Sequence, residues 1–417
     1  MTSQQSPPAA AAKSPRPPAP TTVTALDDDL LREILLRLPS LPTLVRAALS
    51  CRTFFHAVRS SPAFRRSFRK ARPPPLLGLF FDPDGPSIPA FAPLRRRSDP
   101  DLAAVVRGAD FFLTRLPDDD DDDDEDALPD WVIKDCRDGY VLLEHGSLEQ
   151  YAVYNPLTRA LDLIPQPPDE IFDDGHGVAS SLGCYILSSE EGGEALRLVY
   201  TCYDESRARA AVFSSESREW QILPWSKPVT PLPEDEHWLQ LGTMVNGFVY
   251  WIHKNLAYIL VLNTATLQFS QVDVPRVLVG HDLMFKVGET KDGKPCIVCP
   301  VDFHLFVWVW RAGHDGIEKW KFHKRIPLET IVEVTDGTLD EHSELKVLAI
   351  IGGFVYFCTM DMLADANYPC WFLSLCMETG ELGTLFRRRF DGHVHPYIMA
   401  WPPSLIDNKV NPQLEGA

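Results

Sequence analysis

The sequence predicts an α+β protein with several domains: a short domain of three helices near the N-terminus, followed by a larger all-β domain. Three observations predict this division. Apolar residues recur at helical spacing between residues 26 and 68, and a stiff proline triplet follows at Pro73-Pro74-Pro75. Short apolar segments separated by turn signals then fill most of the 417 residues, a length that allows two or three domains.

The segment before the helices has a different composition. Residues 1–25 are largely Pro, Ala, Ser and Thr, with almost no bulky apolar side chain before Val23. Such a segment cannot bury enough apolar surface to offset the entropy of ordering, so we expect a disordered N-terminal tail. We also expect a disordered tail over residues 406–417.

The first predicted helix lies between Asp27 and Pro39. Asp27 or Asp28 can cap its first turn, where acidic side chains suit the helix dipole, and Pro39 ends it. One apolar stripe runs along it, formed by Leu30, Leu31, Ile34, Leu35 and Leu38.

Two further helices are predicted. The second runs from Leu41 to Val58, with Pro42 suited to its first turn because a missing N–H costs nothing there. Its apolar side chains recur at helical spacing at Leu44, Ala48, Cys51, Phe55 and Val58. The third helix begins at Ser61-Pro62 and places Phe64 and Phe68 on one face.

About 43 residues are too few to bury a self-sufficient core, so these helices must pack against something else. The order of a leucine-rich helix, a Leu-Pro pair and a Ser-Cys-Arg helix resembles the F-box, which docks substrate receptors onto the Skp adaptor of cullin–RING ubiquitin ligases. Further matching residues are Arg46, Ala47 and Ser50. Two positions depart from the family pattern, because Asp27 replaces a proline and Phe54 replaces a tryptophan.

The resemblance implies which side chains would contact the adaptor. They are Leu26, Leu30, Leu31, Ile34, Leu35, Leu38, Pro39, Leu44, Cys51, Arg52, Phe54 and Val58. We therefore read residues 26–72 as an F-box domain. The alternative is a small helical cap that packs on the following domain.

The all-β part, residues 73–405, repeats. Two-residue turn signals end at Gly85, Gly139, Gly193, Gly247, Gly293 and Gly353, at intervals of 54, 54, 54, 46 and 60 residues. Such pairs accept the positive φ of tight hairpins. A second landmark is a strand–turn–strand unit that ends in a proline, at Pro165, Pro224, Pro275 and Pro327.

A period of 46 to 60 residues with about four short strands per unit is typical of propeller blades. The pattern resembles the propeller-like associated domain of plant F-box proteins and, more loosely, the kelch repeat. We expect five or six blades, of which the first, residues 76–128, has the weakest pattern.

The net charge of −18 is unevenly distributed. Residues 1–72 hold 12 Lys or Arg and 4 Asp or Glu, a net charge of +8, so the remainder carries −26. Nucleic-acid binding needs Lys and Arg to neutralise phosphates, so an acidic receptor domain argues against nucleic acid and fits basic or neutral protein partners.

Cysteine usage and hydropathy indicate the compartment. The nine cysteines are scattered, and there is no hydrophobic N-terminal signal, so we expect reduced thiols in a cytoplasmic and/or nuclear protein. The most apolar stretch, residues 347–360, is too short to span a membrane and is broken at Gly352-Gly353, so we read it as two strands.

Several features carry both a structural and a functional interpretation. The acidic run 118–126 is expected to be a solvated loop, with capture of a basic partner or a cation as the alternative. A basic cluster after the helices is either a charged helix face or a contact for an acidic ligase partner; its members are Arg65, Arg66, Arg69, Lys70 and Arg72. Trp225, Trp238 and Trp401 lie near turns and could line a binding face.

We expect no metal, cofactor or catalytic site. Cys296 and Cys299 form a lone pair without the second pair that tetrahedral zinc needs, and they should point to alternating environments in a strand. His393 and His395 could share one strand face, but two ordinary loop histidines are favoured. The motifs G-x-S-x-G, H-E-x-x-H and G-x-G-x-x-G and the phosphate loop are absent.

The sequence therefore predicts a non-catalytic, substrate-recognition subunit of a Skp–cullin–F-box ubiquitin ligase, which recruits an unidentified protein substrate. Its partners would be a Skp-type adaptor and, through it, a cullin–RING ligase, with no nucleic acid and no membrane. The alternatives are a propeller-type sugar-binding protein or hydrolase, and an F-box scaffold that directs no degradation.

Overall fold

The computed structural model describes residues 26–72, 74–82, 89–94, 100–117, 131–175, 179–187, 196–204, 206–228, 242–252, 258–279, 285–313, 318–335, 344–360, 369–389, 392–402 and 405. Both predicted tails and the acidic run 118–126 lie outside these residues. So do Trp238 and the turn pairs at Gly85 and Gly193.

The N-terminal helices form one bundle, called here the helical unit. It contains α1 (Asp28–Leu36), α2 (Leu41–Ser50), α3 (Arg52–Arg59) and α4 (Pro62–Ala71). The prediction of three helices was wrong, because the second one is split. Cys51 is extended, with φ −155° and ψ 156°, and its thiol accepts a hydrogen bond from the Phe54 N–H at 3.5 Å, which caps α3.

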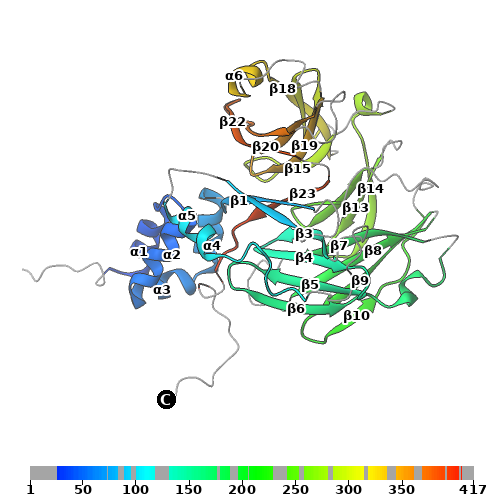
Figure 1. Cartoon of the computed structure of the whole chain (residues 1–417), viewed down its shortest axis with the longest axis horizontal. Coiled ribbons are helices and arrows are strands. Elements are labelled where there is room, and N and C mark those ends of the chain that lie inside the picture. The colour runs from blue at the N-terminus through cyan, green and yellow to red at the C-terminus, as the bar shows by residue number, and fades with distance from the viewer. Residues whose placement is uncertain are drawn as a thin grey trace, which may run out of the picture.

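The rest of the described chain forms a six-bladed β-propeller (Figure 1). Blade 1 contains β3 (Trp131–Arg137), β4 (Tyr140–His145), β5 (Gln150–Asn155) and β6 (Ala160–Pro165). Blade 2 contains β7 (Ser180–Leu187), β8 (Arg197–Tyr203), β9 (Ala208–Ser214) and β10 (Glu219–Ile222). Blade 3 contains β11 (Thr243–Val245), β12 (Phe248–Ile252), β13 (Tyr258–Asn263) and β14 (Gln268–Asp273).

Blade 4 contains β15 (Lys286–Glu289), β16 (Pro295–Val301), β17 (His304–Ala312) and β18 (Glu318–Pro327). Blade 5 contains β19 (Glu344–Ile351), β20 (Phe354–Met360), β21 (Cys370–Cys376) and β22 (Leu382–Arg388). The closing blade has the order β2-β1-β23, with β1 at Leu76–Phe81, β2 at Ala90–Pro93 and β23 at Val394–Ile398. Short helices lie between strands, α5 (Pro100–Gly108), η2 (Asp169–Phe172), η3 (Arg276–Leu278) and α6 (Ile331–Thr335).

The ring is closed by strands from the two ends of the β-domain. β1 pairs antiparallel with β23, so that Phe80 lies opposite His395 and Phe81 opposite Val394. In Figure 1 the red β23 runs beside the light blue β1. The first predicted unit had the weakest pattern because it supplies only two strands of its blade, and the third comes from the C-terminal end.

Turn chemistry follows the predicted pattern. Positive φ angles occur at Asp138-Gly139, Asn246-Gly247 and Gly352-Gly353, each of which joins the first and second strands of a blade. Between the third and fourth strands, the Asn155 side chain accepts hydrogen bonds from the N–H groups of Leu157 and Thr158. The side chains therefore stabilise the turns as expected.

Neighbouring blades share apolar cores around the whole ring. The alternation of a strand puts Cys296 in the core between blades 4 and 5 and Cys299 in the core between blades 3 and 4, as predicted. At the inner strands, a Cβ on Gly288 would lie 2.3 Å from the Ile350 Cβ, so only glycine allows β15 and β19 to approach this closely. Within the described chain, none of the helices is long and apolar enough to cross a membrane.

Candidate functional site

The candidate site is built on α1, which begins as predicted. The Asp27 carboxylate accepts a hydrogen bond from the Leu30 N–H at 2.8 Å and so caps the helix. Asp28 and Asp29 follow in the first turn, where their charge complements the positive end of the helix dipole. The start of α1 is therefore fixed by local chemistry that the sequence already carries.

The apolar stripe of α1 is divided between two environments. Leu31 and Leu35 are 1% and 3% exposed and join a core cluster with residues of α2, α3 and α4. Leu30 and Ile34 are 48% and 45% exposed. Neighbouring helical residues lie about 100° apart, so a stripe this wide covers more than one packing interface. The structure thus leaves two large apolar side chains of α1 facing solvent.

The other predicted adaptor contacts are also distributed unevenly. Leu44 and Val58 are buried in the same cluster as Leu31 and Leu35. Those half-buried are Leu26, Leu38, Cys51 and Phe54, and those exposed are Pro39 and Arg52.

Direct adaptor contact by the four buried residues needs correcting, because their side chains form the core of the helical unit itself. They cannot touch a partner in this conformation. The sequence reading also missed Leu49 of α2, which is 62% exposed. The sequence could have predicted this exposure. Leu49 follows the buried Ala48 and falls outside the helical spacing of the buried apolar residues of α2.

Arg32 fixes the exposed face of α1 in position. Its guanidinium donates hydrogen bonds to the Ala57 carbonyl at 3.0 Å, to the Ser60 hydroxyl at 3.2 Å, and to carboxylate oxygens of Asp28 and Asp29 at 3.2 and 3.0 Å. One side chain therefore joins the first turn of α1 to the C-terminal end of α3. These bonds also fix the orientation of Leu30 and Ile34, which lie two positions before and after Arg32 on the same helix.

The predicted basic cluster is largely structural. Arg65 is buried and donates to the Arg59 carbonyl at 2.6 Å, while Arg72 donates to the Leu38 carbonyl at 3.2 Å. Arg69 lies over the Trp401 ring, and burial lowers its pKa, partly opposed by Asp138. Only two members, Arg66 and Lys70, remain exposed for contact with an acidic partner.

The inner side of the helical unit is joined to the propeller. Phe68 of α4 is fully buried and meets the Trp401 ring edge-on, with centroids 5.9 Å apart. Arg46 of α2 forms an ion pair with Asp101 of α5. One continuous core cluster extends from the helices into the closing blade and blade 1. Trp401, which could have lined a binding face, is buried in this joint instead.

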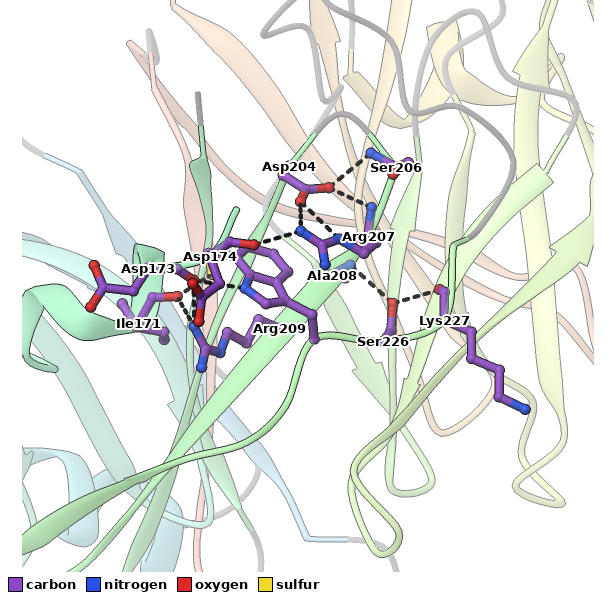
Figure 2. A network of polar contacts seen from close by, with 12 residues as sticks. Ile171, Asp173, Asp174, Asp204, Ser206, Arg207, Ala208, Arg209, Ser226 and Lys227 are labelled. Carbon is purple, nitrogen blue, oxygen red and sulfur yellow. Dashed lines mark hydrogen bonds and ion pairs between the residues drawn. The ribbon is translucent and has the colours of Figure 1, made fainter. Parts of the chain in front are cut away.

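Trp225 also has a structural role, beside the network of Arg207, Arg209 and Asp204 that Figure 2 shows. Its ring lies against the guanidinium groups of both Arg207 and Arg209, at 5.0 and 5.4 Å, and its indole N–H donates to the Asp173 carbonyl. Arg209 donates to main-chain carbonyls around η2, and Arg207 binds the buried Asp204 carboxylate. These contacts hold the η2 loop on blade 2.

The histidine pair and the cysteine pair that were weighed as metal ligands each place their two side chains in different surroundings. His395 is buried on β23, with its Nε2 3.4 Å from the Asp82 Oδ1, whereas the His393 side chain is exposed. Burial raises the pKa of the Cys296 and Cys299 thiols to about 12. In the part of the chain that the structure describes, no group of three or more His, Cys, Asp or Glu could hold a metal ion.

Comparisons with solved structures give weak likenesses to other proteins. A nidogen/laminin complex chain is 12% identical, with a TM-score of 0.37, over 78% of this chain and 99% of that one. An oligogalacturonate lyase in complex with manganese is 10% identical, with a TM-score of 0.35, over 62% and 65%. A putative 6-phosphogluconolactonase from Bacteroides fragilis is 11% identical, with a TM-score of 0.31, over 61% and 70%. Likenesses this weak say nothing about the function of the chain.

The family comparison is more decisive. No curated protein matches the chain. The family model described as "F-box protein AT5G49610-like, beta-propeller" matches residues 132–405, from the first strand of blade 1 to the end of the described chain. This match covers well over half of the 417 residues and agrees with the six-bladed ring. The chain therefore belongs to the F-box protein AT5G49610-like β-propeller family.

Proposed function

We propose that this chain is the substrate-recognition subunit of a Skp–cullin–F-box ubiquitin ligase. In this role the helical unit is an F-box that binds a Skp-type adaptor, and the plant-type, kelch-like propeller recruits a protein substrate. The observation that carries the proposal is the exposure of Leu30 and Ile34 on a capped helix whose orientation Arg32 fixes. Exposed large apolar side chains on a rigid helix are typical anchors of a protein–protein interface.

The buried leucines have a different part in this proposal. Leu31 and Leu35 pack against the other helices and hold the exposed face in shape, while Leu30, Ile34 and Leu49 are available to the adaptor. The contact set proposed from the sequence therefore separates into supports and anchors. Only the anchors should change adaptor binding without changing stability.

The chain needs no catalytic group for this function. A receptor acts by proximity, because holding a substrate beside a charged conjugating enzyme raises the effective concentration of the reacting groups. We also propose that the chain is located in the cytoplasm or nucleus, because thiols stay reduced in those compartments. All nine cysteines are free in the structure.

The proposal is tested by pull-down of a Skp-type adaptor with purified full-length chain. The pair Leu30→Ala and Ile34→Ala removes two exposed anchors and should abolish binding, since a buried interface anchor typically contributes about 2–4 kcal/mol. Its unfolding free energy should stay within about 0.5 kcal/mol of wild type, because exposed sites contribute little to folding.

A matched control uses two similarly exposed leucines of the propeller. Leu148 and Leu163 are 41% and 36% exposed and lie in blade 1. Leu148→Ala with Leu163→Ala should leave adaptor binding unchanged. Full adaptor binding by the Leu30 and Ile34 double variant would refute the proposed docking face.

A further inference from the structure

Lys286, on the inner strand of blade 4, is a half-buried cation that lacks a counter-charge among the described residues. Other half-buried lysines have partners. Lys134 pairs with Glu144, Lys324 donates to a main-chain carbonyl, and Lys346 has an interaction of its own. No hydrogen bond or ion pair joins the Lys286 ammonium to another described residue. An unpaired charge in such a place is costly, which favours a ligand that supplies the missing anion.

The position of Lys286 in β15 directs its side chain toward blade 5. Side chains alternate along a strand, so Lys286 lies on the same face as Gly288 and on the opposite face from Val287. Gly288 packs against Ile350 of β19, whereas Val287 is buried in the core between blades 3 and 4. The Lys286 side chain therefore lies where the inner strands β15 and β19 meet.

Basic side chains from three blades come together at this place. Desolvation and then the charge of Lys346 on β19 lower the pKa of Lys286 to about 8, which leaves it largely charged at pH 7. Burial also lowers the pKa of His393, just before β23; Asp82 opposes this, and the charges of His395, Lys346 and Lys286 add to it. Basic groups of blade 4, blade 5 and the closing blade therefore lie within electrostatic range of one another.

The described carboxylates of the inner strands do not compensate Lys286. Asp82 lies 3.4 Å from the His395 Nε2, and Glu289, at the other end of β15, accepts a hydrogen bond from a main-chain N–H. Neither of them, nor Glu344 at the start of β19, is among the groups that act on Lys286. The positive charge of Lys286 is therefore open to an added anion.

The basic group lies toward the ring face that is remote from the helical unit. In each four-stranded blade the first strand leads into a turn to the second, and the Gly353 N–H donates to the Glu289 carbonyl at 3.2 Å, so the turns of blades 4 and 5 lie side by side. The helical unit lies on this turn face, because Asp138 of the blade 1 turn acts on Arg69 of α4. Lys286 begins β15 and is at the opposite end from the turn.

We propose that Lys286, with Lys346 and His393 near it, binds a compact anion, a phosphate or a carboxylate group, on the ring face remote from the helical unit. Lysine binds phosphate as a point charge, and an anion here would supply the counter-charge that Lys286 lacks. The anion is either a free ion or the end of a partner protein's side chain, and the two sources share the same chemistry.

Anion binding is measured through thermal unfolding of the full-length chain, titrated with inorganic phosphate or acetate at constant ionic strength. A ligand that binds only the folded state raises the melting temperature. Lys286→Met should weaken anion binding roughly tenfold, because it removes a charge-assisted hydrogen bond. Without added anion this variant should be at least as stable as wild type, since an unpaired charge is removed. Lys286→Arg keeps the charge and should retain most of the response.

A matched control removes a charge at the other end of β15. Lys294, in the turn from β15 to β16, is paired with Asp292 at 2.5 Å, and Lys294→Met should respond to the anions as wild type. An equal response by wild type and Lys286→Met would overturn the proposal, and so would an equal loss in the control. Failure of both anions to stabilise the wild type would overturn it as well.

Three peptides separate the two sources of the anion. Fluorescein-labelled peptides that carry phosphoserine, glutamate or serine at one position are compared by fluorescence anisotropy. Binding of a charged peptide that phosphate displaces and that Lys286→Met loses would assign the anion to a partner side chain. Anion binding without peptide binding would assign it to a free ion. Equal binding of all three peptides would contradict recognition through an anionic group.

Identification of such a partner as a ligase substrate rests on the proposed function, but the anion assay does not. Leu30→Ala with Ile34→Ala should leave anion binding unchanged, and Lys286→Met should leave adaptor binding unchanged. Failure of one proposal is therefore distinguishable from failure of the other.

Discussion

The two sides of α1 carry similar large apolar side chains but differ in how far those side chains are exposed. Leu30 and Leu31 are adjacent in the chain, yet one is 48% exposed and the other 1%. Leu31 and Leu35 belong to a core that extends through α4 into the propeller, whereas Leu30 and Ile34 project away from it. The comparison teaches that an apolar stripe in a sequence locates an amphipathic helix but does not separate its core residues from its binding residues.

The arrangement of the helical unit explains this difference. In Figure 1, α4 lies toward the β-sheets and α1 lies on the remote side of the bundle. The inner side gains apolar partners from the propeller, including Trp401 against Phe68. Among the described residues, α1 packs against the other helices on its inward side, and Leu30 and Ile34 on its outward side stay exposed.

The largest expected effect comes from the buried side of α1. Leu31→Ala with Leu35→Ala should cost about 2–5 kcal/mol at each site, because each substitution leaves a cavity in a closed core. Chemical unfolding followed by circular dichroism would measure this loss. A double variant as stable as wild type would mean that the two leucines are not core residues, and the division of α1 would fail.

A somewhat smaller effect is expected at the joint between the helical unit and the propeller. Phe68→Ala should cost about 3–5 kcal/mol by removing a buried ring that contacts Trp401. Hydrogen exchange should then show faster exchange in α4 than in the inner strands of the blades. Faster exchange that is equal throughout the ring would contradict a local role for Phe68.

The smallest of these effects concerns the segment that supports the joint, and it depends on pH. Burial raises the pKa of Asp110, but hydrogen bonds from Tyr154 at 2.5 Å and from Thr114 outweigh it, so the pKa is lowered. A carboxylate with a lowered pKa in the folded state stabilises the fold at neutral pH, and this stabilisation is lost as the pH falls through its pKa.

Asp110→Asn should therefore cost about 1.5–3 kcal/mol at pH 7, the usual range for hydrogen bonds to a charged group. Below about pH 4 the difference from wild type should shrink, because the Asp110 carboxylate then takes up a proton in the unfolded chain at a higher pH than in the folded protein. Urea unfolding of both proteins across this pH range would measure it. A difference that does not change with pH would show that the hydrogen bonds act without the charge.

Local chemistry was enough to predict many elements. Asp27 caps α1, Ser61 caps α4, and the turn pairs at Gly139, Gly247 and Gly353 join first and second strands. These features need only a few consecutive residues, because a cap or a tight turn is decided within one or two turns of backbone. The break at Cys51 was missed because apolar spacing continues unchanged across it.

The sequence by itself determined the repeating four-stranded units, their turns and the amphipathic helices before them. Only the tertiary structure decided that the ring has six blades, because β23 completes the sheet that β1 begins and no local signal links segments more than 300 residues apart. It also decided which apolar side chains of α1 are buried and which are exposed. Exposure depends on what packs against a residue, and those neighbours come from elsewhere in the chain.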